Sequence, residues 1–356
     1  MRDLDGPAVE AAVAGGSVLA CGGGGWVPHG YLVGRTAVAY GAPRLASVDE
    51  VDPDALVVTV TAIGAPAAGD WEMRPRDYVR ALQLLADQLD QPIVGTMTAQ
   101  NGSSTTCNGW LQSAVLGTVV LDAAGDGRAH PTGKMGSIGL TALEGYTTVQ
   151  AAAGGNRAQG RYLECVARGT VASCANTLRT AAVESGGFIA AARNPVRADY
   201  VREHAAVGAI SLALGLGEAV LGAEQHGADA VIAAICDRLG GRVLARGPVR
   251  DRVLRTEGGF DIGSLCVDEV DVGFVNEYLS ADANGERLAT FPDVLTTLSL
   301  QTGRPVSIAD IRDGDQVAVL HADKAQIPLG ASVLDPDLYP EVEHMLGRPL
   351  ATYALA

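Results

Sequence analysis

The run ALVVTVTAI, at residues 55–63, constrains the fold more than any other segment. A continuous apolar run rich in β-branched residues is typical of a strand that is buried on both faces. The segment 76–89 has apolar residues at helical spacing and no internal breaker, which predicts an amphipathic helix. A second strand is predicted at 92–97. Strands that alternate with helices in this way indicate an α/β layer with a largely parallel sheet.

The alternation of strands and helices continues on both sides of this unit. Helices are predicted at 4–14, 31–40, 111–116, 162–184 and 198–213. Further strands are predicted at 17–20, 118–121 and 146–152. From Arg242 onward, short β-like segments separated by turn signals predict a small β-sandwich or barrel.

The change of pattern near residue 240 predicts two domains, which suits a chain of 356 residues. We predict a three-layer α/β domain over 1–240, which carries the site, and a smaller β-rich domain over 241–339. The tail at 340–356 either ends the second domain or returns to the first.

Charge and hydropathy exclude several classes of function. The chain has 26 Lys and Arg residues against 41 Asp and Glu residues, and this net charge of −15, without a basic block, argues against nucleic-acid binding. No apolar stretch approaches the length of about 18 residues that a membrane span needs, and the N-terminus does not look like a signal peptide. We expect a cytoplasmic homo-oligomer with a small-molecule substrate and no nucleic-acid or membrane partner.

Open α/β sheets bind ligands beyond the carboxyl ends of their strands, where loops converge and helix N-termini point outward. Three loops are predicted at such ends: 21–30, 99–109 and 122–137. The first, CGGGGWVPHG, offers backbone N–H groups to an anion or a flat polar ligand. Its candidate substrate-binding residues are Cys21, Gly22, Gly23, Gly24 and Gly25.

His29, close behind these glycines, is a candidate general acid or base. The run GGGG lacks the GxGxxG spacing, and no GK[ST] follows it, so no nucleotide cofactor is expected. A tight turn with a purely structural role is the alternative interpretation of the loop.

The second loop is dense in polar side chains. Asn101 is a candidate for substrate binding, and Cys107 is a candidate nucleophile if its thiol pKa is lowered. An ordinary helix-capping loop is the competing interpretation.

The third loop, DAAGDGRAHPTGKMGS, holds the richest set of chemical groups. Asp122 as a positioned carboxylate and His130 as a proton carrier suit hydrolysis. Arg128 and Lys134 add positive charge for substrate binding. Simple solvation of these charges on the surface is the alternative.

No metal-binding spacing such as HExxH or CxxC occurs among the six cysteines and six histidines. Scattered ligands can still converge in the fold, so a divalent metal such as zinc remains open.

The segments CGGGGWVPHG, IGAP at 63–66 and DAAGDGRAHP at 122–131 together resemble the S-methyl-thiohydantoin desulfurase-like family. RVLARGPV at 242–249, VNEYL at 275–279 and FPDVL at 291–295 resemble its second domain. Ala124, His130 and Thr132 depart from the family pattern in the third loop. The resemblance implies an N-terminal three-layer α/β domain and a C-terminal β-rich domain.

The activity that this resemblance implies is the hydrolytic release of methanethiol from an S-methylated thiohydantoin, which leaves the hydantoin. We therefore predict a hydrolase acting on a small cyclic amidine or imide. The alternatives are a non-catalytic protein that keeps the family cleft for a small ligand, and a nucleotide-binding protein.

Overall fold

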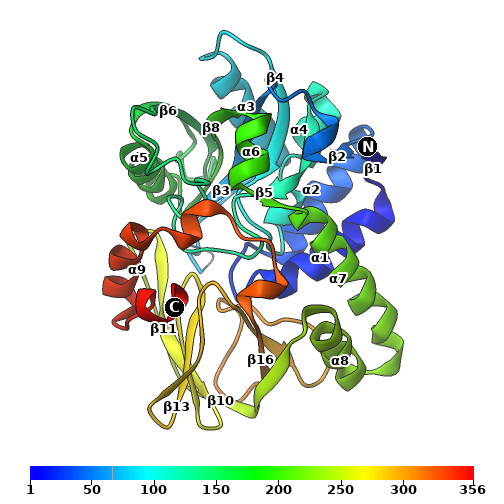
Figure 1. Cartoon of the computed structure of the whole chain (residues 1–356), viewed down its shortest axis with the longest axis vertical. Helices are drawn as coiled ribbons and strands as arrows, with labels where there is room; N and C mark the ends of the chain where they lie inside the picture. The colour runs from blue at the N-terminus through cyan, green and yellow to red at the C-terminus, as the bar shows by residue number, and fades with distance from the viewer. Residues whose placement is uncertain (66) are drawn as a thin grey trace.

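A computed structural model describes residues 1–65 and 67–356 of the chain. Pro66, which ends the predicted IGAP turn, lies outside the described residues. The molecule contains a nine-stranded sheet flanked by helices and a seven-stranded sheet, which lie one above the other in Figure 1. The described residues include no helix that is long and apolar enough to cross a membrane.

The nine-stranded sheet is mixed. Its order is β1-β2-β5-β4-β3-β8-β6-β7, with β9 paired to β5. Strands β2, β5, β4 and β3 are parallel, whereas β8, β6 and β7 continue the sheet in antiparallel pairing. The strands are β1 (Arg2–Asp3), β2 (Arg44–Ala46), β3 (Leu56–Gly64), β4 (Ile93–Thr98), β5 (Val119–Ala124), β6 (Thr148–Gly154), β7 (Leu163–Gly169), β8 (Phe188–Arg197) and β9 (Ala206–Val207).

Helices cover both faces of this sheet, which confirms the predicted three-layer α/β domain. The first face is covered by α3 (Pro75–Ala86) and α4 (Trp110–Leu116), with α1 (Gly6–Leu19) and α2 (Val27–Tyr40) beside them. The opposite face is covered by α5 (Val171–Glu184) and α6 (Ala198–His204). Two further helices, α7 (Ala209–Ala223) and α8 (Ala228–Leu239), extend from α1 toward the second sheet.

The side chains of β3 point alternately to the two faces of the first sheet and pack under the helices on each face. Val58 and Val60 pack under α3 with Ala151 and Ala192, whereas Ile63 packs under α5. Successive side chains of a strand point to opposite faces, so a continuous apolar run is needed where both faces are covered. The strand predicted at 55–63 and the helix predicted at 76–89 are therefore confirmed.

The strand predicted at 17–20 is wrong, because these residues end helix α1. The Asp5 side chain accepts a hydrogen bond from the Ala8 N–H (2.9 Å) and caps this helix. Small residues then allow α1 to pack closely on α7, where Gly15 and Gly217 leave no room for a Cβ atom. The loop consequently follows a helix and not a strand, and it ends at Trp26, because Val27–Gly30, predicted as part of the loop, form the first turn of α2.

Two predicted helical tracts are also corrected. Residues 162–184 form strand β7 and then α5, because Gly169 has a φ of +158° and Thr170 caps the new helix. Residues 198–213 form α6, the short strand β9 and the start of α7, with a left-handed Gly208 between them. Strand β8, which lies between β3 and β6, was not predicted, because its alanine-rich sequence gives no strand signal.

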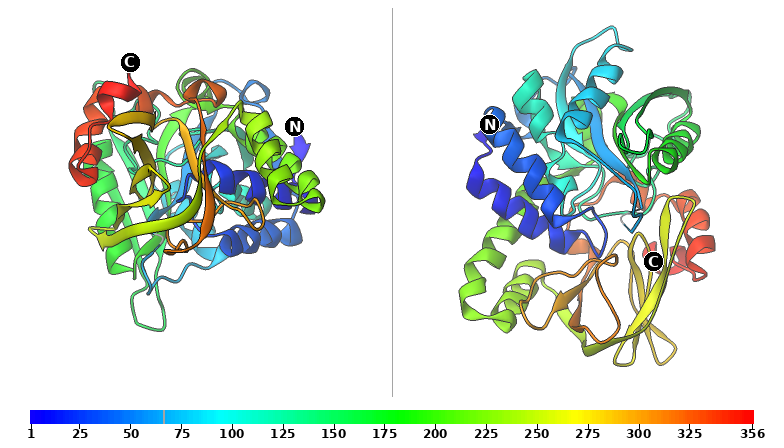
Figure 2. Two further views of the ribbon diagram at one scale, coloured as in Figure 1. Left: turned by 90° about the horizontal axis from the view of Figure 1, so that it is seen from below. Right: turned by 180° about the vertical axis from the view of Figure 1, so that it is seen from behind.

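The second sheet is wholly antiparallel, in the order β14-β13-β12-β11-β10-β16-β15. The sheet curls around its own apolar core as a half-barrel, so the predicted β-rich domain is confirmed as one open sheet (Figure 2). The strands are β10 (Arg242–Glu257), β11 (Phe260–Val267), β12 (Val270–Val275), β13 (Glu277–Ala283), β14 (Glu286–Thr290), β15 (Val294–Ser299) and β16 (Gln316–Ala322).

The C-terminal segment contains α9 (Tyr339–Leu346) and α10 (Ala351–Ala354). Helix α9 packs against β11 and β12, and Figure 1 shows it beside the second sheet. Just before it, the Ser332 hydroxyl accepts a hydrogen bond from the Gly139 N–H of the first domain (2.7 Å). Strands up to β9 belong to the first sheet and strands from β10 to the second, while the exact domain boundary near residue 240 stays a prediction.

Candidate functional site

A cavity of about 250 Å³ lies where the first sheet meets the second. Its first-domain wall comes from the end of β3 and from the loops after β4 and β5, as the convergence of parallel strand ends predicts, and also from α5 and β8. Its second-domain wall comes from Phe260, Asn276 and Glu277. In the rear view of Figure 2, β3 runs down toward the second sheet. The cavity therefore contains groups from both domains.

Glu277 is the first residue of β13 and follows Asn276, which has a φ of +57°. Its side chain is only 3% exposed, and Oε2 has no hydrogen-bond partner among the described residues. Burial raises the pKa of Glu277 to about 8, although Arg128, Arg179 and the Gly24 N–H act in the opposite direction. Near neutral pH the group is therefore mostly an uncharged acid that can both donate and accept a proton.

His130 lines the same cavity, in the loop that follows β5. Its Nε2 lies 3.1 Å from the carbonyl oxygen of Ala99. A carbonyl only accepts, so Nε2 carries the proton and Nδ1, which has no partner among the described residues, keeps its lone pair. Burial, helped by Arg193, lowers the pKa of His130 to about 3, so the ring is neutral and can accept a hydrogen bond.

Two arginines complete the polar lining. Arg193 belongs to β8 and is 2% exposed, and Arg179 belongs to α5. Burial lowers the pKa of both groups to about 10, which leaves both charged at neutral pH. Arg179 donates to the carbonyl oxygens of Gly64 (3.2 Å) and Gly259 (3.0 Å), and its guanidinium lies 4.3 Å from the centre of the Phe260 ring.

The glycine run separates this cavity from a second one of about 390 Å³. Gly24 lines the first cavity, Gly22 and Gly23 line the second, and Gly25 lines both. Gly24 and Gly25 have φ values of +67° and +83°, which favour glycine. The Gly24 carbonyl accepts a hydrogen bond from the Ser104 N–H (3.0 Å), so this loop also packs on the loop after β4.

His29 faces the second cavity and not the first. Its Nε2 lies 3.1 Å from the Tyr78 hydroxyl, and its ring meets Trp26 and Trp71 edge-on. Burial lowers the pKa of His29 to about 4. The structure therefore separates His29 from His130 by the glycine loop.

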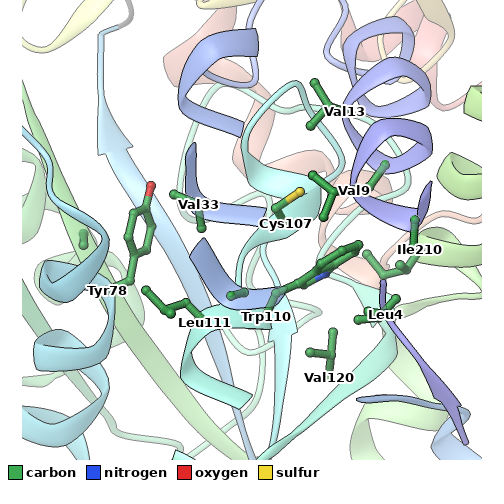
Figure 3. Packing of buried hydrophobic residues seen from close by; sticks show 14 of the residues in the cluster. Leu4, Val9, Val13, Val33, Tyr78, Cys107, Trp110, Leu111, Val120 and Ile210 are labelled. Carbon is green, nitrogen blue, oxygen red and sulfur yellow. The ribbon is translucent and has the colours of Figure 1, made fainter. Parts of the chain in front are cut away.

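Cys107, the predicted nucleophile, lies in the apolar core of the first domain. Figure 3 shows its sulfur among Val9, Val13, Val33 and Trp110, between α1, α2 and α4. The side chain is fully buried, and burial raises the pKa of its thiol to about 12. A nucleophilic thiol needs the opposite shift, so this position gives Cys107 a packing role.

Cys21 is also fully buried and lines neither cavity. Burial raises the pKa of its thiol. Its φ of +49° starts the glycine turn, and its carbonyl accepts a hydrogen bond from the Tyr278 N–H (2.8 Å). Cys21 therefore helps to join the glycine loop to the second domain.

Three other predicted residues are engaged in structural contacts away from the cavity. The Asp122 carboxylate accepts hydrogen bonds from the Ser211 N–H (2.9 Å) and hydroxyl (2.6 Å) in the first turn of α7. Asn101 donates to the carbonyl oxygens of Gly127 (3.0 Å) and Ala209 (2.8 Å). These contacts hold loops and a helix N-terminus in place.

Arg128 is the third of these residues and is completely buried. Its guanidinium donates to the carbonyl oxygens of Tyr278 (2.9 Å) and Asp293, both in the second domain. The group also lies 5.1 Å from the centre of the Phe291 ring. Arg128 thus connects the two domains and does not line the cavity.

Lys134 does line the cavity and forms an ion pair with Glu341 of α9. This pair brings the C-terminal helix to the rim of the site. Among the described residues, no group of three or more His, Cys, Asp or Glu side chains is placed to hold a metal ion, so we assign no metal ligands.

The predicted residues that meet at the cavity between the two sheets are Gly24, Gly25, His130 and Lys134. Glu277, Arg179 and Arg193 were missed. Arg193 could have been found from the sequence, because it lies inside the apolar segment FIAAARNPV, which indicates that its side chain is buried. Charged residues are rarely buried unless they have a partner, so such a position indicates a functional or structural role. Glu277 lies in the VNEYL segment, but its position opposite the glycine loop depends on how the domains pack.

Comparisons with known proteins identify the family. The model for the S-Me-THD-like N-terminal domain matches residues 7–159, and the model for the S-Me-THD-like C-terminal domain matches residues 170–334. No curated protein matches the chain. The crystal structure of a protein from Chromobacterium violaceum is similar, with a TM-score of 0.74, 21% identity and coverage of 97% of each chain. At this identity, the likeness supports the fold alone.

Proposed function

Because the chain belongs to the S-Me-THD-like family, we propose that it hydrolyses a small cyclic amidine or imide in the cavity between its domains. The substrate class we favour is an S-methyl-thiohydantoin, which would yield methanethiol and the hydantoin. The observation that carries the proposal is that the buried Glu277 and His130 line the same cavity, and that Glu277 Oε2 and His130 Nδ1 each have no hydrogen-bond partner among the described residues.

The reaction adds water to the ring carbon that lies between two nitrogens and bears the sulfur. Glu277, as the neutral acid, protonates the ring nitrogen, which makes this carbon more electrophilic. The resulting carboxylate removes a proton from the attacking water, and the new C–O bond gives a tetrahedral intermediate. His130 accepts a hydrogen bond from this water at Nδ1 and orients it.

Collapse of the intermediate forms the ring carbonyl and breaks the C–S bond. Glu277 donates its proton to the departing sulfur and takes the hydroxyl proton in return, so that methanethiol leaves and the acid is restored. One carboxyl group can serve all these steps, because the nitrogen, oxygen and sulfur are bonded to the same carbon. A pKa of about 8 places Glu277 near the working pH for both roles.

The glycine loop supports this chemistry by its shape. Gly24 and Gly25 present backbone without side chains to the cavity, which suits a flat ring. The cavity volume of about 250 Å³ is also suited to a small ring with a short substituent.

The test is an assay with the purified full chain and an S-methyl-thiohydantoin, with thiol release and hydantoin formation followed together. Equal amounts of methanethiol and hydantoin, formed with or without a chelator, would support the proposal. A thermal shift with the same compound in the absence of any product would instead identify a non-catalytic binding protein.

A further inference from the structure

Arg193 lies at the centre of the first sheet, where its cross-strand neighbours are Thr59 on β3 and Gln150 on β6. Side chains directly opposite on neighbouring strands share one face of a sheet. All three are buried, and each keeps an unpaired atom among the described residues: Thr59 Oγ1, Arg193 Nε and Gln150 Oε1. Buried polar atoms normally have hydrogen-bond partners, so this row of three side chains, Thr59, Arg193 and Gln150, can form further hydrogen bonds.

The Arg193 guanidinium extends from this row to the wall of the cavity. There it lies against Gly133, whose backbone it approaches so closely that a Cβ atom would collide with Nη1. Arg179 lines the same cavity and is close enough to lower the pKa of Arg193 further. The positive charges of Arg193 and Arg179 therefore lie near each other in a buried cavity, which is unfavourable unless an anion binds between them.

Among the described residues neither arginine forms an ion pair: Arg179 donates to carbonyl oxygens, and the carboxyl groups of Glu277 and Glu341 act on its charge without a direct contact. Two carboxyl groups line the cavity, but Glu341 is paired with Lys134, and Glu277 is mostly protonated near neutral pH. The cavity is thus positive in a chain whose net charge is −15.

We propose that the ligand of this cavity carries a carboxylate or another compact oxyanion, which Arg193 and Arg179 bind together. Guanidinium groups match the geometry of such anions and bind them through charge-assisted hydrogen bonds. The inference rests on the proposed function in one respect: the anion is expected as a substituent of the cyclic substrate. A free inorganic anion would use the same two arginines.

The test is calorimetric titration of the full chain with 5-carboxymethylhydantoin, with its neutral primary amide and with inorganic phosphate. We expect the carboxylate to bind about tenfold or more tightly than the amide, because charged hydrogen bonds are lost in the amide. Arg193→Gln should abolish this preference, and Arg193→Lys should keep part of it. Arg197→Gln is the matched control, because Arg197 lies on the same strand but is exposed and paired with Asp54.

The three ligands separate the outcomes. A carboxylate preference that depends on Arg193 supports a substrate-borne anion, whereas phosphate binding that depends on Arg193 without such a preference supports a free anion. Equal affinity for acid and amide, together with no phosphate binding, overturns the inference, as does a preference that Arg193→Gln leaves intact.

Failure of the proposed function gives a different result. Anion-selective binding without turnover of any S-methyl-thiohydantoin would contradict the hydrolase and leave the anion site standing. Turnover of a neutral S-methyl-thiohydantoin at the same rate as its acid, in both the wild type and Arg193→Gln, would keep the hydrolase and remove the anion site.

Discussion

Gly23 and Glu277 are so close that a Cβ atom on Gly23 would lie 2.5 Å from Glu277 Oε1. The glycine loop of the first domain therefore packs directly on the carboxyl group of the second. Glu277 can reach the interface between the two domains because Gly23 has no side chain.

This relationship predicts the effect of Gly23→Ala. The φ of Gly23 is not positive, so the new methyl group acts by collision with Glu277 and with the Asn276 carbonyl. We expect hydrolysis to fall sharply and stability to fall by about 1–3 kcal/mol, the usual cost of overpacking. Gly247→Ala is the control, because nothing lies within 4 Å of its Cβ position. Equal activity in both variants would show that this contact does not position Glu277.

Glu277→Gln should change how stability depends on pH. The folded chain keeps the Glu277 proton up to about pH 8, whereas the unfolded chain releases it near the ordinary value of 4.5. The folded state thus binds more protons in this range, and its stability falls as the pH rises. Glutamine stays neutral, so the variant should gain about 2–4 kcal/mol relative to wild type between about pH 5 and about pH 9.

Urea unfolding of both proteins across this range measures the difference. Asp126, whose pKa burial raises to about 7, adds a slope of the same sign to both proteins and cancels in the comparison. Glu164→Gln is the control, because the Arg80 hydrogen bond lowers the pKa of Glu164 to about 2 and keeps it charged throughout. If the difference in the free energy of unfolding between Glu277→Gln and the wild type does not change with pH, Glu277 is ionised in the folded protein.

Cys107→Ser should affect stability and not catalysis. A hydroxyl without a partner in this apolar cluster costs about 1–3 kcal/mol, which lowers the melting temperature. Activity per folded molecule should match the wild type, and iodoacetamide should leave Cys107 unlabelled in the native protein. The half-buried Cys266 on β11 provides a comparison for labelling. Rapid labelling of Cys107 with loss of activity would restore the nucleophile hypothesis.

Arg128→Met should weaken the connection between the domains. The variant leaves the buried carbonyl group of Tyr278 and the part-buried carbonyl group of Asp293 without their donor, which we expect to cost about 2–5 kcal/mol. Calorimetry should show a lower melting temperature, whereas Arg35→Met, which removes an exposed ion pair with Glu10, should change little. Similar melting curves for both variants would contradict a role for Arg128 at the interface.

Helices and strands were predicted correctly where the residue pattern indicates one type of secondary structure clearly. The β-branched apolar run at 55–63 is typical of a strand covered on both faces, and 76–89 has the spacing of an amphipathic helix. The alanine-rich segment of β8 gives no strand signal, because alanine is a helix former that is depleted in strands, so β8 was missed. The end of α1 is a short apolar run, which fits a buried helix or a strand, and it was predicted as a strand.

The part of the candidate site that was predicted lies in loops that follow the strands of the first domain. His130 and Lys134 lie in such a loop, whereas the glycine loop reaches the cavity from the end of helix α1. Arg193 depends instead on the register of β8 against β3, and Glu277 depends on how the second sheet packs on the glycine loop. The apolar segment around Arg193 signals that this residue is buried, but no local pattern shows which residues of other segments lie beside Arg193 or Glu277.

The role of Glu277 is tested by the pH dependence of methanethiol release by the wild type, Glu277→Gln and Glu164→Gln. We predict that kcat/KM of the wild type falls as the pH rises through about 8, where Glu277 loses its proton. Glu277→Gln should be about 100-fold or more slower and lack this decline, and Glu164→Gln should follow the wild type. A wild-type rate and pH profile in Glu277→Gln would show that Glu277 does not transfer the protons of the reaction.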